Sequence, residues 1–358
     1  MPGRWVLAVL LSTAMFTEAF AQSERLPLFA DDSMLSITIE GPIRRLYRER
    51  HERPDLEGSV RYIEDDGTEV VLDVELTARG NTRLELCSFP PVWLNFRRSQ
   101  LDGTIFEGQN RIKLVTLCRD SNSYRDYLAQ EYQIYRAYNA ITDHSFRVRW
   151  LEVEYIDTER SGSTEIAPAF LIEEDWEVAE RHGLEAITVD SISVDQLDPA
   201  RAALLSVFQY VIGSTDWSPI MAVPGDNCCH NTKLIGPDDS ESGRVVLPYD
   251  FDQVGLINAS FAEPSPALPI RRVTDRLFRG YCVHNDYVPA AVELLIEKRA
   301  AVEAAFELLE VRTRQHRQLL QYLEDSYDII SDPEKLREEL LDRCRGPAIL
   351  DGNDAEAG

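Results

Sequence analysis

The sequence has little positive charge to offer a polyanion. Its 37 Lys and Arg residues face 62 Asp and Glu residues, which gives a net charge of -25 at pH 7. Proteins that bind nucleic acids present a basic surface to the phosphate backbone, and anionic membranes attract basic segments for the same reason. We therefore expect no nucleic acid and no anionic membrane surface as a partner. An acidic chain can still bind divalent cations and, through them, nucleotides.

Long apolar runs are missing from residue 22 onward, where none reaches the roughly 18 to 20 residues that a membrane-spanning helix needs. An apolar run does occur at the very beginning, where Arg4 precedes "WVLAVLLSTAMF" and Ala19–Ala21 supplies small residues two positions apart. This order of charge, apolar run and small residues is typical of a secretory signal peptide. We predict a signal peptide over residues 1–21 and a secreted or periplasmic protein without a membrane span.

Cysteine is scarce but even in number, with six residues in 358. In a secreted chain, an even set favours disulfides, and zinc ligation is the alternative. Cys228 and Cys229 are adjacent, which suits zinc less well than a pair separated by two residues. We expect disulfides, including one between Cys87 and Cys118.

The order of hydrophobic patterns divides the chain into a β-rich and a helical part. After a leader over residues 22–34, alternating runs predict strands through 35–175, including a hairpin around Asp66-Gly67. A helix with a stripe of tyrosines over 124–138 is expected within this part, with the stripe as core packing. Residues 176–345 are mainly of helical pattern, and Asp198 before Pro199 is expected to cap the helix in "DPARAALLSVFQYVIG". Residues 346–358 form an acidic tail that we expect to be disordered.

Three polar segments follow or precede apolar runs in a fixed order. Asp216 lies in "GSTDWS" after a predicted helix, Asn231 in "HNTKLI" before a short strand, and Asp250 in "PYDFD" after the next strand. Phosphoryl transfer needs a carboxylate to orient the attacking hydroxyl, and an Asn and a second Asp to hold Mg²⁺ against the phosphates. We predict Asp216 as the catalytic residue, with Asn231 and Asp250 as ligands of Mg²⁺ or Mn²⁺. Asp252 stays open as a second ligand or a loop residue.

These segments resemble the atypical secreted kinases of the CotH type and, more distantly, the HipA-type kinases. The likeness also includes "ARGNTR" at 78–83 and "AFLIEEDWEVAERHG" at 169–183, and it covers roughly residues 75–285. It implies an α+β, two-lobed protein-kinase-like fold with a β-rich N-terminal lobe and a mainly helical C-terminal lobe. It also implies ATP as the cofactor.

The same resemblance implies a lysine for the phosphates and a helix glutamate to orient it. Lys113 is the only lysine between Gln22 and Val211, and Glu131 lies in the helix that follows. We therefore expect Lys113 and Glu131 to pair and to contribute to cofactor binding. A surface ion pair is the plainer alternative for these two residues.

The expected function is a secreted or periplasmic kinase-like phosphotransferase that uses Mg-ATP to modify a hydroxyl of a protein or small-molecule acceptor. Two features depart from the protein-kinase pattern: "DFD" replaces D-F-G, and the insertion Ser218–His230 separates the catalytic Asp from the Asn. The histidine that precedes the catalytic aspartate in kinases is also missing. Two alternatives therefore stay open, a non-catalytic kinase-like envelope binding or scaffold protein and a nucleotide-dependent transferase of adenylyl or glutamyl groups.

Overall fold

The computed structural model of the chain describes residues 26–222, 226–237 and 242–346. The predicted signal peptide and nearly all of the predicted tail lie outside the described residues.

The described part of the chain contains ten strands in two sheets. Their bounds are β1 (Leu35–Gly41), β2 (Leu56–Ile63), β3 (Glu69–Ala78), β4 (Val92–Phe96), β5 (Arg111–Thr116), β6 (Val148–Asp157), β7 (Thr164–Ile172), β8 (Glu185–Ile187), β9 (Thr232–Gly236) and β10 (Val245–Pro248). The predicted hairpin around Asp66-Gly67 is confirmed by the antiparallel pair β2 and β3.

The first seven strands form a closed barrel in the order β1-β2-β3-β4-β5-β7-β6. Alternate residues of β1 are buried, among them Leu35, Ile37 and Ile39, as expected when one face of a strand is turned to a core. The barrel closes where β1 pairs in parallel with β6, so that Leu35 lies opposite Leu151. All other barrel pairs are antiparallel.

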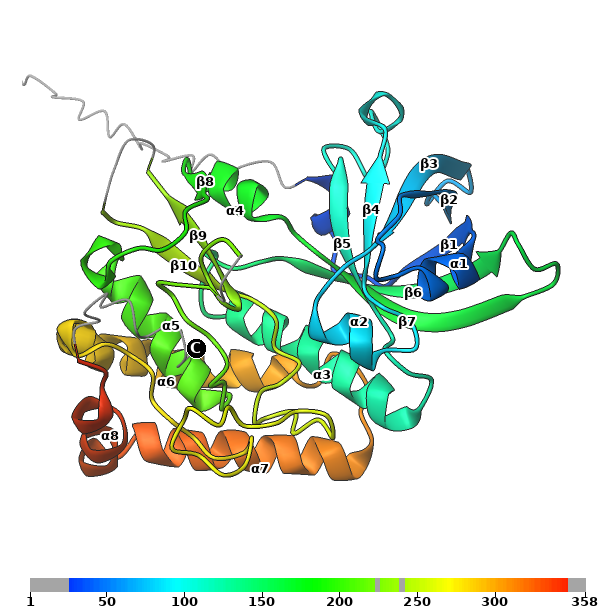
Figure 1. The fold of residues 1–358 in the computed structure, drawn as a ribbon. Helices are drawn as coiled ribbons and strands as arrows, with labels where there is room; N and C mark the ends of the chain where they lie inside the picture. The colour runs from blue at the N-terminus through cyan, green and yellow to red at the C-terminus, as the bar shows by residue number, and fades with distance from the viewer. Residues whose placement is uncertain (1–25, 223–225, 238–241, 347–358) are drawn as a thin grey trace, which may run out of the picture.

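The expected two-lobed protein-kinase-like fold is wrong. Its strands are present, but they close into a seven-stranded mixed barrel, and most of the helices follow in the C-terminal part (Figure 1). One continuous cluster of buried hydrophobic residues extends from Leu28 to Leu340, across the barrel and the helices. Closure depends on pairing residues 116 positions apart, such as Leu35 and Leu151, and local alternation does not encode such pairs. The proposed boundaries of 35–175 and 176–345 stay a prediction.

Eight α-helices complete the described chain. Their bounds are α1 (Ile43–Arg48), α2 (Thr82–Leu86), α3 (Asn122–Asn139), α4 (Asp175–Arg181), α5 (Pro199–Val211), α6 (Val288–Ala305), α7 (Thr313–Ile330) and α8 (Pro333–Glu339). Helix α5 begins as predicted, because the side chain of Asp198 accepts a hydrogen bond from the Arg201 amide at 2.9 Å. None of the described helices is long and apolar enough to cross a membrane.

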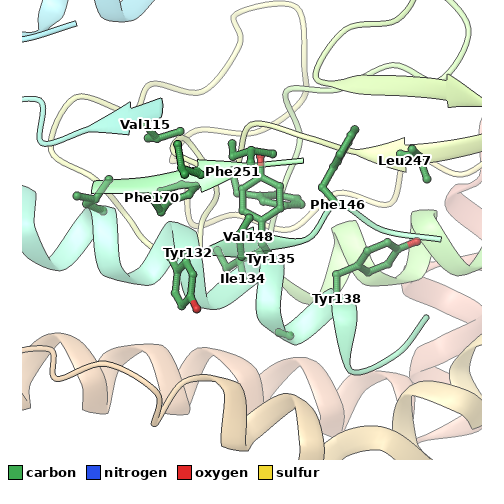
Figure 2. Close-up of a cluster of buried hydrophobic side chains, with 14 of the residues drawn as sticks. Val115, Tyr132, Ile134, Tyr135, Tyr138, Phe146, Val148, Phe170, Leu247 and Phe251 are labelled. Carbon is green, nitrogen blue, oxygen red and sulfur yellow. The ribbon is translucent and has the colours of Figure 1, made fainter. Parts of the chain in front are cut away.

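Helix α3 joins the barrel to the C-terminal helices. It packs against β6 and β7 on the barrel side and against α6 on the other. Figure 2 shows its residues Tyr132, Tyr135 and Tyr138 among the buried side chains of the core. The ring of Tyr135 lies 6.0 Å from that of Phe170 and 4.7 Å from that of Phe251, which follows β10. The tyrosine stripe is core packing, as predicted, and it fixes the loop after β10 to the barrel.

Three disulfides join all six cysteines. The predicted pair Cys87–Cys118 is confirmed, and the others are Cys228–Cys229 and Cys282–Cys344. The expectation of disulfides is therefore confirmed. Disulfides persist in oxidising compartments, which agrees with a secreted or periplasmic location.

Candidate functional site

The predicted polar segments meet at one cavity of about 530 Å³. Its walls come from the loop between β3 and α2, from α3, and from the loops that flank β9 and β10. The residues singled out in the sequence that line it are five: Glu131, Asp216, Asn231, Asp250 and Asp252. Two helices, α3 and α5, and two neighbouring strands of one sheet, β9 and β10, thus bring these side chains to one place.

Asp216, in the loop after α5, is hydrogen-bonded to Asn231, which directly precedes β9. The side-chain Nδ2 of Asn231 donates to the main-chain oxygen of Asp216 at 2.7 Å and to the carboxylate of Asp216 at 3.1 Å. The Nε2 atom of His230 is 2.8 Å from the other carboxylate oxygen. Because the nitrogen of Asn231 is used in this way, its Oδ1 is the atom left for a cation.

The His230 contact sets the charge of Asp216. Burial on its own would raise the pKa of Asp216, but the hydrogen bond and the charge of His230 lower that pKa below its ordinary value. The same hydrogen bond raises the pKa of His230. Asp216 is therefore a carboxylate at neutral pH.

Asn231 and Asp250 both have left-handed backbone conformations, with φ values of 48° and 59°. Such values are uncommon for residues other than glycine and gather at functional sites. Two hydrogen bonds hold the pair in place: the Tyr249 amide donates to the Asn231 carbonyl at 3.0 Å, and the Asp250 amide donates to the Tyr135 hydroxyl at 3.0 Å. Helix α3 thus orients Asp250 toward the cavity wall on which Asn231 lies.

The carboxyl group of Asp250 has a raised pKa. Burial raises its pKa to about 6, and the neighbouring carboxylates of Asp252 and Asp216 add to the increase. Arg83 and Arg79 oppose the shift but do not cancel it. A divalent cation beside Asp250 would favour its charged form and offset this cost.

Arg83 ties together the acidic residues at the edge of the cavity. Its guanidinium is 2.6 Å from the carboxylate of Glu131, 2.8 Å from that of Asp252 and 3.7 Å from that of Asp250. Burial, countered in part by Arg83, raises the pKa of Glu131 to about 8. Glu131 therefore has Arg83 as its ionic partner.

The expected pair of Lys113 and Glu131 does not form. Lys113 is buried on β5, and its Nζ is 2.9 Å from the carboxylate of Glu174. It also lies 5.6 Å from the ring centre of Tyr249, which lines the cavity. The geometry places Lys113 next to the site, and its role in cofactor binding, like that of Glu131, stays a prediction.

Besides Arg83, two further cationic residues of the cavity were not singled out from the sequence. Arg79, at the end of β3, contacts the hydroxyl of Tyr249 and lies 5.1 Å over the ring of Trp93. Lys233 lies on β9, and burial lowers its pKa. A strand places alternate side chains on one face. Because Lys233 is two residues after Asn231, the sequence could have indicated that both side chains face the same cavity.

The cavity therefore has two kinds of polar wall. Asp216, Asn231 and Asp250 offer oxygen ligands, while Arg79 and Lys233 offer positive charge. In the described part of the chain, no group of three or more His, Cys, Asp or Glu side chains is placed to hold a metal ion. Mg²⁺ is often bound by one or two carboxylates together with phosphate oxygens of the substrate, so this donor set fits a metal that arrives with its nucleotide.

No family model matches the chain, and no curated protein matches its sequence. The resemblance to CotH-type and HipA-type kinases therefore stays a prediction that rests on the short motifs alone.

Proposed function

We propose that the chain is an extracytoplasmic phosphotransferase that uses a nucleoside triphosphate, with ATP as the expected donor, and Mg²⁺ or Mn²⁺. The observation that carries the proposal is the convergence of Asp216, Asn231 and Asp250 on one cavity that also contains Arg79 and Lys233. Phosphoryl transfer needs positioning and charge neutralisation above all, and this cavity combines oxygen ligands with cations. The three disulfides support the location outside the cytoplasm.

The chemistry assigns a separate task to each side of the cavity. Asn231 and Asp250 would hold the metal ion, which supplies charge neutralisation at the phosphates when bound. Arg79 and Lys233 would bind phosphate oxygens, as cationic side chains do in phosphoryl-transfer sites. The phosphates would thus lie between the two walls.

Asp216 would orient the acceptor hydroxyl and receive its proton. The acceptor oxygen forms a bond to the terminal phosphorus as the bond from that phosphorus to the bridging oxygen breaks, and the nucleoside diphosphate leaves. The contacts of Asp216 with His230 and Asn231 fix its carboxylate during this step. The acceptor is a protein or a small molecule with a free hydroxyl.

The test measures nucleotide binding and transfer for the mature chain and matched variants. Mn²⁺ and ATP should raise the melting temperature of the wild type, of Asp216→Asn and of the control Asp328→Asn. The carboxylate of Asp328 is exposed on α7. Asp250→Asn should lose the shift. Incubation with γ-labelled ATP should give labelled product only for the wild type and the control.

Two results would contradict the proposal. The first is a wild type that Mn²⁺ and ATP do not stabilise. The second is a shift of equal size for Asp250→Asn. Mass spectrometry of the product separates transfer of a phosphoryl group from transfer of an adenylyl group.

A further inference from the structure

A second cavity, of about 390 Å³, shares no residue with the candidate site. It lies between α1, the facing ends of β6 and β7, the segment that follows Cys87 and the segment around Cys118. Its volume falls within the range of roughly 300–1,000 Å³ that is usual for small-molecule sites. The aromatic side chains in its lining are Tyr47, Phe89 and Tyr155.

The walls of this cavity are held by covalent and hydrogen-bonded links. The disulfide between Cys87 and Cys118 joins its two segments, and the Ser88 amide donates to the Cys118 carbonyl at 2.8 Å. The ring of Phe89 meets that of Tyr155 edge to face at 5.0 Å. The cavity is thus preformed, which lowers the entropic cost of binding a ligand.

Tyr155 is the feature that points to a ligand. Its side chain is only 6% exposed, yet its hydroxyl has no hydrogen-bond partner among the described residues. Burial raises its pKa, and the charge of Glu165 raises it further, so the hydroxyl is protonated and can donate. A buried donor without an acceptor destabilises the fold, and phenylalanine would fill the same place without that cost. An acceptor supplied by a ligand explains why a hydroxyl is kept there.

The charges around the opening favour an anionic acceptor. Arg44 and Arg160 are exposed, and neither forms an ion pair with a described residue. Of the acidic residues in the lining, Asp120 is paired outside the cavity, with Arg125 at 2.8 Å. Asp157 is mostly buried and accepts a hydrogen bond from the Glu159 amide at 3.1 Å. Glu165 is the remaining acidic group of the lining.

We propose that this cavity binds a small aromatic carboxylate. The ring would lie among Tyr47, Phe89 and Tyr155, the carboxylate would accept the hydrogen bond of the Tyr155 hydroxyl, and Arg44 and Arg160 would face its charge. This site is independent of the phosphotransferase activity proposed above, and nucleotide plays no part in it.

The test uses 2-naphthoate as the probe and the mature chain as the protein, with calorimetry as the measurement. We expect saturable binding of one probe per chain. Tyr155→Phe should weaken it by about tenfold or more, because one hydrogen bond to a charged acceptor is lost. Arg44→Gln and Arg160→Gln should each weaken it about threefold, since both are exposed. The uncharged 2-naphthalenemethanol should bind more weakly than the probe.

Stability measurements on the same variants separate this proposal from a structural role of the hydroxyl. Without probe, Tyr155→Phe should melt at the same temperature as the wild type or higher. The control Tyr62→Phe removes a hydroxyl that already accepts from the Ile105 amide at 3.1 Å, so it should melt lower and bind the probe normally. The control Arg314→Gln, on the exposed surface of α7, should leave binding unchanged.

Glu165→Gln gives a further check, because loss of its negative charge should strengthen binding of the anionic probe. The proposal is overturned if 2-naphthoate does not bind at millimolar concentration, or if Tyr155→Phe binds it as well as the wild type. It is also overturned if Tyr155→Phe and Glu165→Gln both lower the melting temperature, since Tyr155 and Glu165 would then be partners in solution.

Discussion

Replacing Asp250 with asparagine should make the free protein more stable while removing its response to metal and nucleotide. The pKa of Asp250 is raised from 3.8 to about 6, first by burial and then by nearby carboxylates. Asparagine removes the charge with nearly the same shape. It also tolerates the left-handed backbone, with φ of 59°, better than most residues. The substitution therefore isolates the charge.

The magnitude follows from the pKa shift. A rise of about two units corresponds to about 3 kcal/mol of destabilisation for the charged form. The Asp250 side chain is 39% exposed, so water screens part of this cost, and we expect about 1–2 kcal/mol. The pKa of Asp250 is higher in the folded state than in the unfolded state. The wild type therefore avoids this cost below about pH 4, and its free energy of unfolding falls as the pH rises through about 6.

Urea unfolding at pH 4.5 and 7.5, followed by tryptophan fluorescence, checks the reasoning. Asp250→Asn should match the wild type closely at pH 4.5 and exceed it at pH 7.5. With Mn²⁺ and ATP at pH 7.5 the order should reverse, because only the wild type can bind the metal. The control Asp328→Asn should follow the wild type throughout. A variant that is less stable than the wild type at pH 7.5 without metal, or a difference that does not change with pH, would refute the reasoning.

Three further substitutions test the parts that support the site. Lys113→Met should cost about 3 kcal/mol, because it leaves the carboxylate of Glu174 buried without its partner, and urea unfolding measures the loss. Serine at both Cys282 and Cys344 should cost about 2–4 kcal/mol, since that disulfide closes a loop with a separation of 62 residues, and the melting temperature of the double variant reports it. Gly213→Ala should lower the melting temperature, because Gly213 has φ of 66° and a Cβ there would overlap a tyrosine hydroxyl of α7.

The parts of the fold that sequence reasoning predicted are those with local causes. The hairpin around Asp66-Gly67 follows from a glycine that adopts φ of 87° between two alternating runs. Helix α5 follows from the cap Asp198 and a proline at its first position. Each of these signals lies within a few residues of the structure that it predicts.

The barrel could not be predicted in the same way. Its closure depends on the parallel pairing of β1 with β6, and any pattern with one buried face would also suit a neighbouring antiparallel strand. The alternation of β1 was therefore read correctly, but the partner strand was not identified. A kinase-like arrangement was inferred from the motifs, which describe loops and leave the pairing of strands open.

The candidate site shows the same division between local and distant causes. Asp216 and Asn231 were found because each follows or precedes a recognisable element, and the structure joins them by hydrogen bonds. The partner of Glu131 was misjudged, since Arg83 lies 48 residues earlier in the short helix α2, whose position depends on the whole barrel. Lys113 was favoured because lysines are scarce, and scarcity carries no geometric information.

The choice between Asp250 and Asp252 as metal ligand follows from Arg83. The carboxylate of Asp252 is 2.8 Å from the guanidinium and only 8% of the residue is exposed, so its charge is already balanced within the protein. Asp250 is 3.7 Å from the same guanidinium, and its side chain is 39% exposed toward the cavity that it lines. A cation that enters the cavity therefore meets the free charge of Asp250 first. In the proposed metal site, Asp252 would act through Arg83, because it holds the guanidinium at 2.8 Å and would leave the charge of Asp250 for the metal.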